Sequence, residues 1–518
     1  MTPRLVVLAL AFIAVRGARA QAPAAGEAVA VVTVDTRRAG GIIPRDFIGY
    51  SLEVSTAGQG IGSFQGANPF AGGAAEQSIY ALGRPGAPNE GYFHLMHNLG
   101  AGILRLGGNS QDNTCWDRAR APHPDACQAA LDSADLALWA TAAAASGWKL
   151  IVGLNLKQNN PAWAVREVTE GIARAIPMKD VFALEPGNEP DLFGRTPYRS
   201  QPYAPADQAR EFVAYARLFW VNSVARGFAL AGPATCCGWR NPRDLEVFLT
   251  ALRGMPLKLV TVHNYSATTC NGQTVSIARL LSRELMAQVD SDARGLARTA
   301  REHRQPIRMA ETNSASCGGM PGVSNAFASA AWGLDYAFTL ARAGFVGVDF
   351  HTSYRPGGGS SYNPVDTYAR QDSSGALLYR NVAEPLYYAL YLFANHAAGA
   401  QRLPVATEAK ANVQAYAVRG CAECEVRIFV LNKDTAAAGP VRVHLARRMG
   451  AASLLLLAAP SLGSLAPDVR YGGRQFDSDG GIGAPDTAVV RPDARGDYVF
   501  DLPNAAIALL TVRPRGSR

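Results

Sequence analysis

The chain has 518 residues, which is too long for one small domain and leaves room for two or three domains of roughly 150 residues each. Hydrophobic residues make up 48% and charged residues 18%, which excludes a disordered chain of low hydrophobicity and high charge. The formal net charge is +8, but no block of Lys and Arg with interleaved aromatic residues occurs. A nucleic-acid partner therefore has little support.

The first twenty residues have the pattern of a cleavable export signal. Arg4 precedes an apolar run over residues 5–15, and residues 18–20 (Ala-Arg-Ala) supply the small residues of a cleavage site before Gln21. The apolar run of eleven residues is too short to cross a bilayer of about 30 Å as a helix. We expect a secreted or periplasmic protein that begins near Gln21 and makes no membrane contact once the signal is removed.

Eight short apolar runs recur between residues 46 and 353, each ending in polar or glycine-rich residues. They are residues 46–53, 101–108, 149–156, 181–189, 228–234, 257–265, 307–313 and 344–353. The segments between them, such as 129–147, 205–226, 277–304 and 325–343, have the composition of amphipathic helices. Strand and helix alternating eight times over about 300 residues is typical of a (β/α)8 TIM barrel. We place this catalytic barrel at residues 41–398.

Helical patterns stop after about residue 400, and short runs between Gly, Pro and Asp predict an all-β sandwich over residues 399–518. The runs are residues 413–418, 425–431, 441–445, 453–458, 498–502 and 507–512. Residues 28–35 are also strand-like and lie outside the barrel count. We therefore expect an α/β fold in which residues 21–40 give the C-terminal sandwich an additional N-terminal strand.

Eight cysteines in an exported chain predict disulfides. Cys115 with Cys127, and Cys421 with Cys424, are close enough in sequence to be proposed first. A zinc site is disfavoured because Cys421 and Cys424 have no second pair or His cluster nearby. We expect no metal and no organic cofactor. The other four cysteines follow candidate barrel strands with their connectivity open: Cys236, Cys237, Cys270 and Cys317.

Barrel active sites form at the carboxyl ends of the strands, so the polar residues at the ends of the eight runs are the candidate site. They are Glu53, Asn109, Asn155, Asn188, Glu189, His263, Asn264, Tyr265, Glu311, Thr312, Asn313 and His351. Carboxylates, amides and imidazoles that face one basin can hydrogen-bond many hydroxyl groups, and Trp116, Trp163 or Tyr354 can stack on a sugar ring. This set of side chains predicts a sugar-binding basin.

Two glutamates at strand ends have the chemistry that glycoside hydrolysis needs, one carboxyl group protonated and one ionised. Glu189 stands in residues 187–190 (Gly-Asn-Glu-Pro) after the fourth run, and Glu311 stands in residues 310–313 (Ala-Glu-Thr-Asn) at the end of the seventh. Strands four and seven lie nearly opposite each other in an eight-stranded ring, so both side chains can reach one bound sugar. The alternative acid/base, Glu185, lies inside its run rather than at its end.

Neighbouring residues are candidates for supporting roles. Arg105 would lie beneath the basin, where its guanidinium can hold Glu311 ionised and oriented, although a structural ion pair is an equal alternative. His263 and Tyr265 follow the run next to that of Glu311. We expect His263 to orient this carboxylate and Tyr265 to donate a hydrogen bond to it or to the substrate, with loop packing as the alternative. For His351 a catalytic role and a purely structural one are evenly balanced.

These motifs resemble glycoside hydrolase family 79, the β-glucuronidase and heparanase group of the retaining (β/α)8-barrel glycosidases. The similarity spans nearly the whole mature chain and rests on residues 47–53, 104–112, 186–190, 261–265, 311–319 and 471–473. It implies Glu189 as acid/base, Glu311 as nucleophile and Asn188 as a contact to the sugar 2-hydroxyl. It also implies that Glu53 and Asn109 lie near the remaining hydroxyls of the glycone.

The resemblance further implies a uronate carboxylate held by tyrosines and backbone N–H groups after the nucleophile and after strand eight. Tyr362 is similar to the later tyrosine, and Gly318 can supply a backbone donor without side-chain obstruction. Five residues after Glu311, where many members have an aromatic hydroxyl, this chain has Ser316, followed by Cys317.

We therefore expect a secreted retaining β-glucuronidase that releases glucuronic acid from glycans or glycosides by double displacement. The partner is then a glucuronic-acid-containing oligosaccharide or glycoside. Two alternatives stay open, a neutral-sugar β-glycosidase on the same barrel and a non-catalytic carbohydrate-binding protein. The insert over residues 58–89, rich in Gly, Ala and Pro, is expected to wall off one side of the basin and favour exo action.

Overall fold

The computed structural model describes residues 28–54, 77–78, 81–116, 127, 129–237, 241–352 and 360–514. The expected export signal, Tyr354 and most of the 58–89 insert lie outside the described residues.

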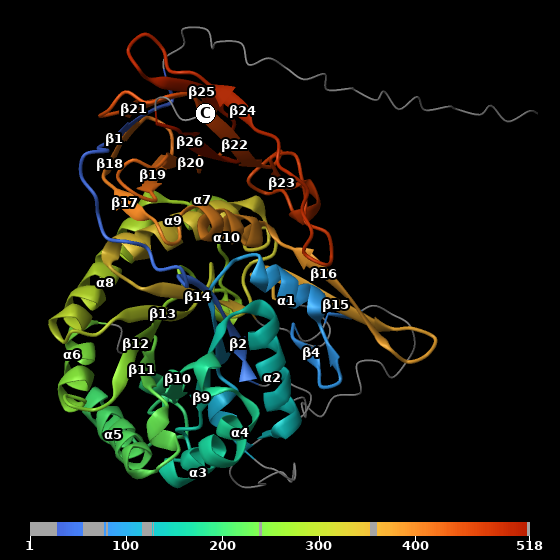
Figure 1. Cartoon of the computed structure of the whole chain (residues 1–518). Helices are drawn as coiled ribbons and strands as arrows, with labels where there is room; N and C mark the ends of the chain where they lie inside the picture. The colour runs from blue at the N-terminus through green and yellow to red at the C-terminus, as the bar shows by residue number, and fades with distance from the viewer. Residues whose placement is uncertain are drawn as a thin grey trace, which may run out of the picture.

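Eight parallel strands close into a barrel in the order β10-β11-β12-β13-β14-β2-β6-β9 (Figure 1). The strands are β2 (Ile48–Glu53), β6 (Ile103–Gly107), β9 (Lys149–Leu154), β10 (Val181–Pro186), β11 (Leu230–Thr235), β12 (Leu257–His263), β13 (Ile307–Thr312) and β14 (Gly347–Thr352). Nearly every residue of these strands is buried, because helices cover the outer face and side chains fill the inner one. All eight predicted strands are confirmed, and each ends within a few residues of its predicted end.

Helices connect the strands and lie outside the barrel (Figure 1). They are α1 (Glu90–His97), α2 (Ser133–Ser146), α3 (Pro161–Arg166), α4 (Ala173–Ala175), α5 (Pro205–Val221), α6 (Pro242–Ala251), α7 (Ile277–Leu280), α8 (Arg283–Glu302), α9 (Phe327–Ala343) and α10 (Pro385–His396). Two predicted helices differ from the structure. Residues 129–131 form a short strand, β8 (Ala129–Leu131), and the helix predicted over 277–304 is divided because Ser282 caps the N-terminus of α8.

Two sheets form a β-sandwich after the barrel, with strand orders β18-β1-β21-β25 and β17-β19-β20-β26-β22-β23, and β24 pairs with β22. Its strands are β17 (Gln401–Leu403), β18 (Val405–Ala409), β19 (Val413–Arg419), β20 (Val426–Asn432), β21 (Gly439–Leu445), β22 (Ala452–Ala458), β23 (Arg470–Tyr471), β24 (Ala488–Val490), β25 (Tyr498–Leu502) and β26 (Ala506–Val512). The N-terminal strand β1 (Ala30–Val34) lies between β18 and β21. The predicted sandwich and its additional strand are therefore confirmed.

The sandwich packs on α9 and α10 (Figure 1). The Phe338 ring of α9 lies 4.5 Å from the Tyr416 ring and 4.9 Å from the Phe429 ring, measured between centroids. Sixteen of the seventeen residues of α9 are buried, and Asp335 of this helix accepts hydrogen bonds from Lys433 Nζ and the Tyr416 hydroxyl. The barrel and the sandwich are thus joined by a continuous apolar interface with one buried ion pair.

A hairpin that the sequence analysis did not predict follows the last barrel strand. Strands β15 (Val365–Gln371) and β16 (Leu377–Ala383) pair along their length, and β3 (Gln77–Ser78) adds to their edge. Two further small pairs are formed by β4 (Gly83–Arg84) with β5 (Ala87–Pro88) and by β7 (Thr114–Trp116) with β8. The hairpin projects from the barrel beside α1 (Figure 1).

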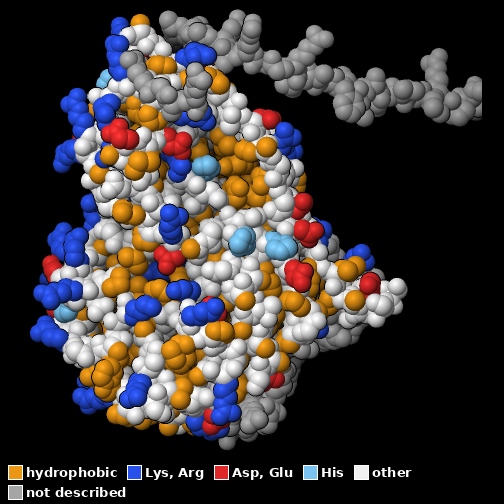
Figure 2. All heavy atoms as spheres, viewed as in Figure 1, with side chains coloured by type: hydrophobic (Ala, Val, Ile, Leu, Met, Phe, Trp, Pro, Cys, Tyr) orange, Lys and Arg blue, Asp and Glu red, His pale blue; other side chains and the backbone are white. Residues whose placement is uncertain are grey.

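Four disulfides are formed, Cys115–Cys127, Cys236–Cys237, Cys270–Cys317 and Cys421–Cys424. The two pairs proposed first are confirmed, and Cys270–Cys317 links the loops that follow β12 and β13. Within the described parts of the chain, no helix is long and apolar enough to span a membrane. Lys and Arg side chains are scattered over the face shown in Figure 2 and are most frequent along the side formed by α6 and α8.

Candidate active site

The predicted acid/base, Glu189, lies just beyond the carboxyl end of β10. Its backbone is left-handed, with φ of 49°, and its N–H donates to the carbonyl oxygen of Ala234 in β11 at 2.9 Å. Burial, followed by the charges of Glu311 and Asp191, raises the pKa of Glu189 well above its ordinary value. This shift favours the protonated carboxyl group, which is the state a proton donor needs.

The predicted nucleophile, Glu311, lies in β13 one residue before the strand ends. Its Oε2 accepts from Nη1 of Arg105 and its Oε1 accepts from the Tyr265 hydroxyl, both at 2.9 Å. Burial alone would raise the pKa of Glu311, but neighbouring imidazoles, Arg105 and the Tyr265 hydrogen bond outweigh burial and hold this pKa below its ordinary value. Glu311 is therefore ionised at neutral pH.

The two glutamates face each other across a short gap. One carboxylate oxygen of Glu189, one of Glu311 and a ring nitrogen of His263 all lie within 4.8 Å of one another. Carboxyl groups about 5 to 5.5 Å apart suit direct attack on a sugar, whereas a gap of about 6.5 to 9.5 Å leaves room for an intervening water. Two close carboxyl groups with opposite protonation can act as proton donor and nucleophile on one substrate bond.

Arg105, in the middle of β6, connects four residues beneath this gap, three of which were candidates from the sequence. Besides Glu311, it donates from Nε to Glu185 at 2.6 Å, from Nη1 to Ser51 at 3.0 Å and from Nη2 to Asn188 Oδ1 at 2.9 Å. Both Arg105 and Glu185 are fully buried. Glu185 is therefore the partner of the guanidinium and lies behind the basin, in agreement with its lower rank as a candidate acid/base.

His263 was predicted to orient the nucleophile, but the structure places it closer to the acid/base. Its Nδ1 lies 3.2 Å from Glu189 Oε1 and 4.0 Å from Glu311 Oε2. Burial, followed by the charge of Arg105, lowers the pKa of His263 to about 4, so the ring is neutral at pH 7. The same three groups could ligate a cation, but Arg105 already supplies a positive charge to Glu311 and disfavours a second one.

The residues expected around the glycone surround the same gap. Glu53 accepts from the backbone N–H groups of Asn109 and Ser110 at 3.1 and 2.8 Å, so its carboxylate is held at the basin rim. Asn188 Nδ2 donates to Asn109 Oδ1 at 3.5 Å. His351 lies between Glu53 and Glu311, with its Nε2 3.8 Å from Glu53 and its Nδ1 3.7 Å from Glu311.

The loop expected to hold a carboxylate packs beside Tyr362. The carbonyl oxygen of Gly318 accepts from the Ser361 N–H at 2.7 Å, and the Tyr362 ring centroid lies 6.3 Å from that of Tyr265. Gly318 has φ of +94°, a conformation that favours glycine, and its N–H donates to none of the described residues. The Cys270–Cys317 disulfide holds the neighbouring position. Among the described residues, the turn therefore keeps a backbone donor unused, and it contacts the segment that carries Tyr362.

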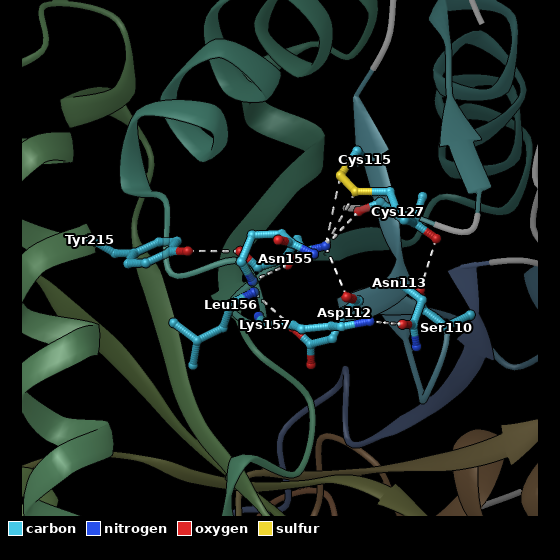
Figure 3. Close-up of a disulfide and its surroundings, with 11 residues drawn as sticks. Ser110, Asp112, Asn113, Cys115, Cys127, Asn155, Leu156, Lys157 and Tyr215 are labelled. Atoms are coloured by element: carbon cyan, nitrogen blue, oxygen red, sulfur yellow. Dashed lines mark hydrogen bonds between the residues drawn. A yellow bond between two sulfur atoms is a disulfide. The ribbon is translucent and has the colours of Figure 1, made fainter. Parts of the chain in front are cut away.

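Sequence analysis did not identify two carboxylates that position the site. Asp112 accepts from the N–H groups of Leu156 and Lys157 at 2.7 and 3.1 Å (Figure 3), and from that of Asn188 at 2.8 Å. Asp191 accepts from the N–H groups of two loop cysteines after β11. The partners of Asp112 lie 44 to 76 residues away from it in the sequence, so no local sequence pattern indicates these contacts.

No family model matches the sequence. A β-glucuronidase of Neurospora crassa is 25% identical over 346 residues, which are 58% of this chain and 59% of that protein, so the match spans less than two thirds of the relative. A 4-O-α-L-rhamnosyl-β-D-glucuronidase of Fusarium oxysporum has a similar structure, with a TM-score of 0.70 and 18% identity over 93% of this chain and all of that one. A family 51 arabinofuranosidase of Xanthomonas axonopodis pv. citri gives a TM-score of 0.65 at 15% identity over 94% of this chain and all of that one.

The chain is a glycoside hydrolase-like (β/α)8 barrel with an attached β-sandwich, as its fold and its similarity to these proteins show.

Proposed function

We propose that the chain is a retaining β-glucuronidase that hydrolyses glucuronic-acid-containing glycans or glycosides. The observation that carries the proposal is the close pairing of Glu189 and Glu311, with burial and neighbouring charge raising the pKa of the first and hydrogen bonds and positive charge lowering that of the second. Retention requires this combination of a short gap and unequal protonation.

In the first step, a carboxylate oxygen of Glu311 attacks the anomeric carbon while Glu189 transfers its proton to the departing glycosidic oxygen. The bond to the leaving group breaks as the ester to Glu311 forms. In the second step, water attacks the same carbon, Glu189 takes the water proton, and Glu311 leaves as a carboxylate. The imidazole of His263 contacts Glu189 in both steps, while Glu189 first loses and then regains its proton.

The choice of a glucuronide rests on the loop after Glu311 and on the relatives. The Tyr362 ring lies beside that of Tyr265, and Gly318, whose N–H donates to none of the described residues, contacts the adjoining Ser361, so an anionic group on the sugar could accept from this side of the basin. A 25% identical relative is named a β-glucuronidase, and a similar structure is named a rhamnosyl-glucuronidase. Four disulfides suit the oxidising environment of an exported enzyme.

Hydrolysis of p-nitrophenyl β-D-glucuronide, β-D-glucoside and β-D-xyloside by the full chain tests the substrate. We expect the glucuronide to be preferred, and preference for either neutral sugar would reject the glucuronidase assignment. Proton NMR of the first product tests the mechanism, because retention releases the β-anomer first and inversion releases the α-anomer.

The Glu311→Gln variant separates catalysis from mere binding. It should lose turnover by orders of magnitude while it still binds D-glucuronic acid. Turnover that is absent before the substitution would instead identify a carbohydrate-binding protein. Glu189→Gln should reduce turnover of a poor leaving group by about 10²- to 10⁴-fold, because proton donation to the leaving oxygen is lost.

A further inference from the structure

Basic side chains gather at the amino end of the barrel, opposite the end that carries the two catalytic glutamates. In (β/α)8 barrels this end ordinarily serves stability only. Five strands that are consecutive in the ring, β9 to β13, are entered or begun by residues 147–149, 177–181, 225–230, 252–258 and 303–307. These segments hold one acidic residue, Asp180, and six basic residues, all of them exposed: Lys149, Lys179, Arg226, Arg253, Lys258 and Arg304.

The charges of these six residues are not neutralised by neighbouring carboxylates. Among the described residues, none of the six forms an ion pair. Glu246 of α6 lies near enough to Arg253 to feel its charge, but His303 engages this carboxylate at 2.9 Å. Burial, followed by the charge of Lys149, lowers the pKa of Lys258, so ammonium groups from two different strands repel each other here. The amino end therefore presents uncompensated positive charge.

A cluster of exposed hydrophobic side chains lies within this basic face. Nine large hydrophobic side chains are exposed among the described residues, and four of them adjoin the entries to β10 and β11. Met178 is 50% exposed, and Trp220, Val221 and Val224 at the end of α5 are 64%, 74% and 40% exposed. The two segments are in contact, because a Cβ atom on Gly227 would lie 2.8 Å from Cε of Met178 and the Gly227 N–H donates to the carbonyl oxygen of Val224 at 3.0 Å.

The four hydrophobic residues and the six basic ones together form what we call the amino-end patch. Its apolar part lies near the middle of the arc from β9 to β13, with basic residues on both sides. Tryptophan and aliphatic side chains bordered by Lys and Arg are typical of protein surfaces that lie in the headgroup region of an anionic bilayer. An acidic polysaccharide could pair with the basic residues, but it offers no apolar phase for Val221, Val224 and Met178.

We propose that the amino-end patch binds the surface of an anionic phospholipid bilayer, with its hydrophobic side chains inserted among the headgroups and its basic side chains pairing with lipid phosphates. Glu189 and Glu311, at the other end of the strands, then face away from the bilayer. The expectation of no membrane contact after signal removal rests on spanning segments alone, and a peripheral contact needs none. Binding at this face does not depend on the proposed glycosidase activity.

Cosedimentation with lipid vesicles tests the proposal. The chain should begin at Gln21, so that the apolar run of the expected export signal cannot itself bind lipid. We expect saturable binding to phosphatidylcholine vesicles that contain about one third phosphatidylglycerol, and much weaker binding to pure phosphatidylcholine. Binding should weaken as sodium chloride is added, because salt screens the contacts between basic side chains and phosphates.

A pair of substitutions isolates the hydrophobic contribution. Trp220→Ser combined with Val221→Ser should weaken vesicle binding by about tenfold or more, because the bilayer no longer buries their apolar surface. Leu378→Ser combined with Val489→Ser is the matched control, since these side chains are 41% and 63% exposed on the hairpin and on the sandwich. The control should bind as the unaltered chain does.

A second pair isolates the electrostatic contribution. Lys179→Gln combined with Arg226→Gln should weaken binding by about tenfold or more, because each basic residue near an anionic surface contributes roughly a fivefold factor. Arg447→Gln combined with Arg448→Gln removes the same charge from exposed positions of the sandwich and should leave binding unchanged. The melting temperature of each variant identifies any loss of folding.

Three results would overturn the proposal: no binding to the anionic vesicles, binding that both patch variants retain, or equal losses in the patch variants and their controls. Polygalacturonate that binds more tightly than the vesicles at equal charge, and that loses affinity in the patch variants, would assign the patch to acidic glycans and reject the bilayer. Absence of glucuronide turnover in the unaltered chain would reject the proposed function alone, because vesicle binding is measured without a substrate.

Discussion

The Tyr265 hydroxyl donates a 2.9 Å hydrogen bond to Oε1 of Glu311, on the side of the carboxylate opposite Arg105. Tyr265 follows β12 and Glu311 belongs to β13, so neighbouring strands of the barrel supply the two partners. The contact stabilises the ionised form of Glu311 and leaves the attacking oxygen in a defined orientation. It is one of the contacts through which the pKa of Glu311 is kept below its ordinary value.

The Tyr265→Phe variant should therefore raise the pKa of Glu311. Activity that requires ionised Glu311 is lost as the pH falls through this pKa, so the acidic limb of the kcat/KM profile should move to higher pH, by about one unit or more for a hydrogen bond to a charged group. The profile with p-nitrophenyl β-D-glucuronide measures the shift. Tyr203→Phe, which removes a 3.0 Å hydrogen bond to Glu211 elsewhere, is the control, and an unmoved acidic limb in Tyr265→Phe would contradict the assignment.

The Asp191→Asn variant should change the basic limb of the kcat/KM profile. The negative charge of Asp191 raises the pKa of Glu189, so its removal lowers that pKa. Because the proton donor must be protonated, activity is lost as the pH rises through the pKa of Glu189, and the basic limb of kcat/KM should move to lower pH. The N–H groups of Cys236 and Cys237 donate to different oxygens of Asp191, so asparagine keeps an acceptor for one of them and loses the other hydrogen bond. A reduced rate with an unchanged basic limb would indicate a structural role only.

The buried pair of Arg105 and Glu185 predicts that a double variant can regain stability without regaining activity. Arg105→Met leaves Glu185 as an uncompensated buried carboxylate, which should lower the free energy of unfolding by about 3 to 5 kcal/mol. The double variant Arg105→Met with Glu185→Gln should recover part of that loss, as measured by urea denaturation. Activity should stay low in both, since Glu311 and Asn188 have lost their common donor. Full activity in the double variant would refute the positioning role of Arg105.

The ion pair between α9 and the sandwich allows a test of how strongly the interface stabilises the barrel and the sandwich together. Lys433 Nζ lies 2.5 Å from Asp335, and both side chains are at most 4% exposed. Lys433→Met should lower the free energy of unfolding by about 3 to 5 kcal/mol because Asp335 loses its counter-charge. Lys179→Met, at an exposed position, should change it by no more than about 0.5 kcal/mol. Separate unfolding transitions of barrel and sandwich in the unaltered chain would contradict a shared interface.

Much of the fold could be predicted because each barrel strand is an apolar run with a distinct polar end. The same regularity located Glu189 and Glu311, whose positions depend only on which strand ends where. The hairpin of β15 and β16 was missed because its strands mix polar, charged and apolar residues, Arg370 and Arg380 among them, without a strongly apolar face. Its role in the structure comes from pairing with distant segments.

The finer parts of the site could not be derived in the same way. Asp112 acts by accepting backbone N–H groups from two other loops, and nothing near it in sequence identifies those partners. His263 was placed correctly at a strand end, but its nearer partner depends on side-chain directions that a strand position does not determine.

The burial of helix α9 between the barrel and the sandwich limits how these two domains can be exchanged between related chains during evolution. It follows β13 in the barrel, yet its residues are buried on every side because the sandwich covers the face that the barrel leaves open. A recombination event that exchanged the C-terminal sandwich alone would expose this apolar helix or set it against an unfitted surface. The barrel and the sandwich are therefore expected to be inherited together, and a chimaera of two relatives should retain function only when α9 and its sandwich come from the same parent.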